Sequence, residues 1–174
     1  MNIIVLYVCI AGMVNGVTYL DSVMYVVCDK SSCIDVFSAN TFTPVNEGIL
    51  VEGMKNPTDI VVCRHGRQLY VPDSGEFIWA VSVDVHSPVK WLPTESMSGT
   101  LDITSLSLTS QHLLVTSQRR KLYLWSTTDK HLLREVPLPG HMTRVQHAAE
   151  TTRDTFVVCH QGTSEDSKRH AVSH

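Results

Sequence analysis

The stretch LYVPDSGEFIWAV, residues 69–81, decides the fold. It holds two apolar runs, LYV and FIWAV, that are rich in aromatic and β-branched residues and are separated by a polar turn. This pattern is typical of two antiparallel strands joined by a hairpin. Similar pairs recur at residues 24–37 and 112–125, and TFVVC at 155–159 begins another. The chain shows no sustained helical period, so we predict an all-β protein.

A repeat of 44 residues aligns these strand pairs. Three sets of positions carry the spacing, namely Tyr25, Leu69, Leu113 and Val157; Asp29, Asp73 and Ser117; and Ile34, Ile78 and Leu122. Further strand-like residues at 58–63 and 89–92 bring each unit to the size of a four-stranded propeller blade. A blade cannot bury its apolar face alone, so neighbouring blades must stack. We predict a partial β-propeller of about three and a half four-stranded blades.

One copy of the repeat carries a family resemblance. GMKNPTDIVV at 53–62, leading into LYVPD, resembles the NHL repeat, in which a proline precedes an apolar strand and an aspartate ends the next. LWS at 124–126 is similar to the Trp-Asp ending of a WD repeat, with Ser126 in place of the aspartate. Residues 12–163 thus resemble NHL- and WD-repeat-type propellers, including those of invertebrates. The resemblance implies a six-bladed type of ring, which this chain would fill only in part.

The chain divides into three expected segments. Residues 1–16 are an apolar N-terminus, either a signal peptide or a strand remnant; 17–163 are propeller blades; and 164–174 are a polar C-terminal tail or a truncated blade. The apolar run at 3–10 is too short to span a membrane. The five cysteines are an odd number and fit small buried residues of a reduced, cytoplasmic protein, although Cys28 and Cys33 could pair if the protein were secreted with residues 1–16 as its signal.

Composition and motifs give little sign of chemistry. The formal net charge of −3 favours neither nucleic acid nor an anionic membrane as a partner. The sequence contains no Gly-x-Ser-x-Gly, phosphate-binding glycine loop or His-Glu-x-x-His. We therefore predict no catalytic, cofactor or metal residues, and the residues that bind a partner are not identified.

Several polar groups receive a structural interpretation. We read Cys63-Arg64-His65 and Cys159-His160 as strand ends entering turns, and Asp29 and Asp73 as acceptors for backbone N–H groups. Five histidines lie near acidic residues in the C-terminal third, where adventitious metal binding is the alternative: His141, His147, His160, His170 and His174, near Asp154, Glu165 and Asp166.

These observations favour a non-catalytic scaffold that binds a protein partner. The alternative is a propeller hydrolase or lyase whose histidines and carboxylates converge on the central channel. An RNA-binding surface would need a broad basic face, and 14 Lys and Arg against 17 Asp and Glu argue against it. An incomplete ring would leave open edge strands, so we also expect self-association.

Overall fold

The computed structural model describes residues 12–45, 47–73, 77–92, 101–109, 112–152, 154–161 and 170–173, the last four as backbone only. They form four antiparallel sheets, three of four strands and one of three, and each sheet is called a blade here. Blade 1 contains β1 (Val14–Leu20), β2 (Val23–Cys28), β3 (Cys33–Ser38) and β4 (Ile49–Leu50). Blade 2 contains β5 (Val61–Cys63), β6 (Gln68–Asp73), β7 (Phe77–Ser82) and β8 (Pro88–Leu92). Blade 3 contains β9 (Ile103–Leu108), β10 (His112–Ser117), β11 (Lys121–Ser126) and β12 (Leu132–Pro137), and blade 4 contains β13 (Thr143–Thr152), β14 (Thr155–Gln161) and β15 (His170–Ser173).

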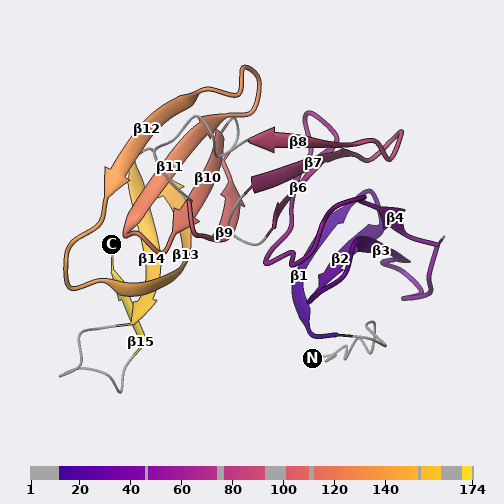
Figure 1. Cartoon of the computed structure of the whole chain (residues 1–174), viewed down its shortest axis with the longest axis horizontal. Helices are drawn as coiled ribbons and strands as arrows, with labels where there is room; N and C mark the ends of the chain where they lie inside the picture. Colours follow the sequence, from indigo (N-terminus) through magenta and orange to yellow (C-terminus); the bar gives the residue numbers. More distant parts are fainter. Residues whose placement is uncertain are drawn as a thin grey trace.

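The blades lie side by side along an arc, from blade 1 in indigo to blade 4 in orange and yellow (Figure 1). Within each blade the strands follow in chain order. The first strands of successive blades contact one another, β1 with β5, β5 with β9, and β9 with β13, so they form the inner side of the arc. The prediction of an all-β partial propeller is therefore confirmed.

Three apolar layers of the core lie one between each pair of neighbouring blades, and a fourth cluster lies on the face of blade 1 that points away from blade 2. Strand β6 shows how one sequence serves two layers, because alternate side chains point to opposite faces of a strand. Leu69 and Val71 pack against blade 1, whereas Tyr70 packs against blade 3. Both faces of the middle strands are thus buried, which explains why these strands appear in the sequence as unbroken apolar runs.

The 44-residue alignment holds for the third strand of each blade. Ile34, Ile78 and Leu122 each join the layer that their blade shares with the following blade. The alignment of the second strand is wrong by one residue in blade 1. Tyr25 packs toward the following blade, but Leu69 packs toward the preceding one.

The reason is the length of a hairpin. Four residues connect β2 to β3, but three connect β6 to β7 and three connect β10 to β11. The extra residue reverses the faces of β2 relative to β6. Tyr25 therefore corresponds to Tyr70, and Cys28, not Asp29, corresponds to Asp73. In blade 4, Val158 joins the layer shared with blade 3, so Val157 does not correspond to Leu113.

Asp73 has the structural role predicted for it. Its buried carboxylate accepts hydrogen bonds from the backbone N–H groups of Lys55, at 3.1 Å, and Asn56, at 2.7 Å, and from the Trp79 indole N–H, at 3.1 Å. At the same position of blade 3, Ser117 donates its hydroxyl to the Leu101 carbonyl. Asp29 lies outside β2 and is half-exposed, so its predicted equivalence to Asp73 is wrong.

A repeated serine turn ends the third strand of blades 1, 2 and 3. In each turn the serine hydroxyl accepts a hydrogen bond from a backbone N–H two or three residues ahead. The residue four positions ahead has a positive φ and donates its N–H to the serine carbonyl. The serines are Ser38, Ser82 and Ser126, and the positive-φ residues are Phe42, His86 and Lys130, both sets spaced by 44.

Three further expectations meet the structure at the chain ends and cysteines. The expected boundary at residue 17 falls inside β1, and β15 lies within the expected C-terminal segment. Residues 1–11 lie outside the described residues, so the signal-peptide interpretation and the cytoplasmic location stay predictions. Cys28 is disulfide-bonded and Cys33 is free, so the expectation of reduced cysteines is wrong at Cys28, and the alternative Cys28–Cys33 pair is also wrong. The part of the chain that the structure describes has no helix with the length and hydropathy needed to cross a membrane.

Candidate functional site

A cleft of about 560 Å³ opens between blades 2 and 3. The β5–β6 turn forms one wall, and the β11–β12 turn together with the start of β10 forms the other. Leu133, Gly66 and the Tyr70 ring also line it, and the lining side chains that carry polar groups for a ligand are Cys63, His65, Gln68, His112, Thr127, Thr128, Asp129 and His131. The volume lies within the range of about 300–1,000 Å³ that is usual for ligand clefts.

The β11–β12 turn, which carries Asp129 and His131, is held in place by the repeated serine. The Ser126 hydroxyl accepts the backbone N–H groups of Thr128 and Asp129, at 3.3 and 3.2 Å. The Asp129 carboxylate lies 3.2 Å from Nδ1 of His131, and both side chains are more than half exposed. When His131 is protonated the two form an ion pair, and both remain accessible to a ligand.

Tyr70 forms part of the cleft wall and of the core behind it. Its side chain is 1% exposed, and its ring meets the Trp91 ring edge-on with 5.0 Å between centroids. The hydroxyl donates to Oε1 of Gln68 at 3.2 Å. Burial, followed by the nearby charge of the Cys63 thiolate, raises the pKa of Tyr70 to about 12. The phenol is therefore neutral at physiological pH and acts as a hydrogen-bond donor, not as a base.

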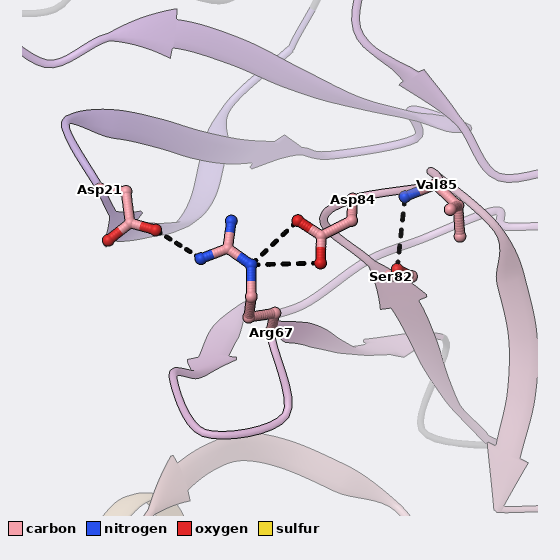
Figure 2. Close-up of polar contacts among 5 residues, drawn as sticks. All are labelled: Asp21, Arg67, Ser82, Asp84 and Val85. Carbon is pink, nitrogen blue, oxygen red and sulfur yellow. Dashed lines mark hydrogen bonds and ion pairs between the residues drawn. The ribbon is translucent and has the colours of Figure 1, made fainter.

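The β5–β6 turn, which forms one wall of the cleft and carries His65, ends at Arg67, and the contacts of Arg67 hold it in place. Nη1 of Arg67 donates to Asp21 at 2.5 Å, and Nε donates to Asp84 at 2.9 and 3.1 Å. Asp21 belongs to the β1–β2 turn and Asp84 to the β7–β8 turn, so one guanidinium joins three turns (Figure 2). The hydrogen bonds that Arg67 donates to the carboxylates of Asp21 and Asp84 raise the pKa of its guanidinium. The same view shows the Ser82 hydroxyl accepting the Val85 N–H, which fixes the turn that carries Asp84 (Figure 2).

Asp59, two residues before β5, places a partly buried carboxylate near His147. Oδ1 of Asp59 accepts the Ile60 N–H at 2.8 Å, and Oδ2 accepts the Leu106 N–H at 2.9 Å. Burial raises the pKa of Asp59, and these hydrogen bonds and the charge of His147 partly oppose the rise. Because Leu106 belongs to β9, Asp59 joins blade 2 to blade 3. Both carboxylate oxygens of Asp59 thus accept hydrogen bonds from backbone N–H groups. Within the described ranges, no group of three or more His, Cys, Asp or Glu side chains could hold a metal ion.

The two cysteine–histidine pairs that the sequence assigned to strand ends behave differently. His65 lies in the β5–β6 turn, as predicted. His160 is buried inside β14, because that strand continues to Gln161, and its Nδ1 lies 2.9 Å from the Gln161 carbonyl oxygen. Its ring meets His141 edge-on at 6.1 Å. Glu165, Asp166 and His174, and the side chain of His170, lie outside the described residues.

Sequence reasoning did not find the residues of this cleft. His65, His112 and His131 are distant in the sequence and share no motif. The one available signal was the 44-residue spacing of Ser38, Ser82 and Ser126, which marks the turns on the cleft side of each blade.

The blades, their shared apolar layers and the inner row of first strands define the class as a β-propeller, and solved structures agree. The chain resembles the WD40 repeats of RRP9 with a TM-score of 0.69 and 15% identity, covering 87% of this chain and 46% of that one. It resembles the β-propeller domain of Cps50 from Myceliophteria thermophila with a TM-score of 0.64 and 9% identity, and the match covers 85% of this chain and 49% of the Cps50 chain. It resembles the computationally designed protein Ika4 with a TM-score of 0.64 and 11% identity, and the match covers 94% of this chain and 90% of the Ika4 chain.

These likenesses show the fold and leave the subtype open. The chain spans less than half the length of the RRP9 and Cps50 chains. No protein-family model and no curated protein matches the sequence. The NHL pattern of blade 2, and the six-bladed ring that it implies, stay predictions from the sequence.

Proposed function

We propose that this chain is a non-catalytic propeller scaffold that recognises a protein partner, and that the cleft between blades 2 and 3 binds an exposed segment of that partner. The observation that carries the proposal is the cleft itself, a hollow with several polar side chains between turns that are held by hydrogen bonds and packed blades. Binding residues commonly stand on turns that a rigid scaffold positions.

The chemistry of the lining suits a peptide. Imidazoles both donate and accept hydrogen bonds, and the threonine hydroxyls and the Gln68 amide do the same. A peptide offers backbone N–H and C=O groups along its length and needs such mixed partners. The neutral Tyr70 and the occupied Asp59 give no support to the hydrolase or lyase alternative.

A display library of random peptides, selected on the purified chain, tests the proposal. Selected peptides are then titrated by fluorescence anisotropy against wild type, the double variant His65→Ala/His131→Ala, and Arg144→Ala. Arg144 lines a separate hollow between blades 3 and 4 and serves as the matched control. Both histidine side chains are exposed, so the double variant should fold normally.

We expect the double variant to weaken binding at least tenfold and the control to leave it unchanged. Circular dichroism and thermal melting of the three proteins should agree, so that a binding loss reports on the cleft. If no peptide is enriched, or if the selected peptides bind the double variant as well as wild type, the cleft is not the recognition site.

A further inference from the structure

The end face of blade 1 exposes side chains whose counterparts in blades 2 and 3 are buried. Val17 pairs with Val26 across β1 and β2, and both point away from blade 2. Ile60 occupies the matching place in blade 2, and Leu106 in blade 3. Val17 is 48% exposed, whereas Ile60 is 2% and Leu106 is 0% exposed.

A neighbouring blade causes that difference. Ile60 is buried because Tyr25 and Val27 of blade 1 pack in the same layer. Leu106 is buried because Tyr70 and Ala80 of blade 2 do so. Blade 1 presents the same kind of apolar position, with Tyr19 beside it at 46% exposure, but the described structure places no blade against it. Apolar side chains arranged in this way mark a surface that another blade can cover.

The open part of this face lies next to the arc's inner side. Farther out, Met24, Val26 and Phe37 are buried and pack with Ala39 and Phe42 of the β3–β4 connection. The surface left for a neighbour is therefore centred on β1, at the position where the inner strands of successive blades meet.

Blade 4 offers the complementary surface at the other end of the arc. Val157 and Cys159 of β14, and Ala149 paired with Val157, point away from blade 3 and are half-buried. In blade 3 the side chains that point the same way, Leu114 and Thr116, are fully buried by blade 4. Blade 1 thus exposes the kind of face that a preceding blade covers elsewhere in the arc, and blade 4 exposes the kind of face that a following blade covers.

The four described blades form an open arc. The chain matches 46% of the RRP9 chain, 49% of the Cps50 chain and 90% of the Ika4 chain, so an arc of this shape occurs in each of these structures. Propellers usually contain four to eight blades, and two copies of this chain would supply eight. Figure 1 shows the same open arc, with blade 1 and blade 4 at opposite ends.

We infer that two copies of this chain close head to tail into one eight-bladed ring, with blade 1 of each copy packed on blade 4 of the other. A two-fold axis then makes the two contacts identical, so the assembly stops at two copies. The β1 residues Val17 and Tyr19 meet the β13 and β14 residues Ala149, Val157 and Cys159 at both contacts.

Sedimentation equilibrium of the purified 174-residue chain, over a range of protein concentrations, tests the inference. The expected mass is twice 19.4 kDa. Val17→Lys should raise the dimer dissociation constant at least tenfold, because it places a charge in both contacts. Val89→Lys is the matched control, since Val89 is 46% exposed but lies on β8 in the middle of the arc. Circular dichroism checks that both variants keep their β structure.

Alkylation of the free thiols tests the blade 4 side without any substitution. Cys159 should react more slowly with a maleimide as the protein concentration rises through the dimerisation range, whereas Cys63, in the cleft between blades 2 and 3, should not change. Peptide mapping by mass spectrometry separates the two rates.

Four results would overturn the inference. A mass of 19.4 kDa at every concentration would mean that the end faces do not associate. Masses that grow beyond two copies would mean an open polymer in place of a ring. Equal weakening by Val17→Lys and Val89→Lys would place the contact elsewhere, and constant Cys159 reactivity would mean that blade 1 pairs with blade 1.

Discussion

Replacing Asp73 by alanine removes the buried acceptor that joins three parts of blade 2. The carboxylate is 1% exposed and receives the N–H groups of Lys55 and Asn56 and the indole N–H of Trp79. Lys55 and Asn56 are exposed, so water can replace the carboxylate at their N–H groups. Trp79 is buried, so its indole N–H loses its partner.

The magnitude follows from these three donors. A buried donor without a partner costs about 1–3 kcal/mol, and each hydrogen bond that water takes over costs about 1 kcal/mol or less. Removal of the buried charge returns part of this, so we expect Asp73→Ala to lower the free energy of unfolding by about 2–4 kcal/mol. Ser117→Ala, at the same place in blade 3, should cost about 1–2 kcal/mol, because it removes two neutral hydrogen bonds, one to the Leu101 carbonyl and one from the Arg119 N–H.

Equilibrium unfolding in urea, followed by tryptophan fluorescence and circular dichroism, measures these changes. Asp29→Ala is the control, because Asp29 lies 44 residues before Asp73 but is half-exposed outside β2. It should change stability by less than about 0.5 kcal/mol. If Asp29→Ala and Asp73→Ala cost the same, the two aspartates are equivalent after all, and the one-residue shift of β2 is refuted.

Three further predictions concern close packing, ionisation and the Arg67 contacts. Gly16→Ala should destabilise the fold by about 1–3 kcal/mol, since its Cβ would lie 2.7 Å from a backbone nitrogen of blade 2, while Gly66→Ala, with 3.7 Å to a thiol, should be nearly neutral in the same urea assay. Absorbance titration should show a tyrosine ionising near pH 12 that Tyr70→Phe lacks. The unfolded chain releases that proton near pH 10, whereas the folded chain keeps it up to about pH 12. The free energy of unfolding should therefore fall between pH 10 and about 12 more in wild type than in the variant. Arg67→Gln should lower the melting temperature, and the difference should shrink in 1 M salt because its pairs with Asp21 and Asp84 are exposed; an unchanged difference would mean that charge is not the cause.

The sequence was sufficient for the strands and for the period of the repeat. Each strand pair is an apolar run bounded by turn residues, and packing on both faces keeps those runs unbroken. The phase of the third strand was also predictable, because Ile34, Ile78 and Leu122 keep both their spacing and their direction. A hairpin of constant length before each third strand would have made the second strands equally predictable.

The phase of the second strand was not predictable, because one residue in a hairpin reverses every side chain of a strand without changing its apolar composition. In β2 this moved Tyr25 to the face opposite that of Leu69 and put Cys28 where Asp73 stands. A run such as VMYVVC is apolar on both faces, so its letters do not reveal which residues face which neighbour.

The cleft escaped prediction for a related reason, which also bears on its use. The serine turns at Ser38, Ser82 and Ser126 recur in blades 1, 2 and 3 with the same hydrogen bonds. The hairpins between first and second strands do not repeat: two residues join β1 to β2, four join β5 to β6, three join β9 to β10 and two join β13 to β14. The longest of these carries both His65 at the cleft and Arg67, which anchors it to the neighbouring turns. One enlarged turn, anchored by Arg67 on packed blades, is the arrangement expected where a scaffold makes a specific contact, because binding loops can vary while the core stays undisturbed. Shortening this hairpin to the two residues found in blade 1 should therefore abolish peptide binding while the urea midpoint falls no further than it does for Arg67→Gln.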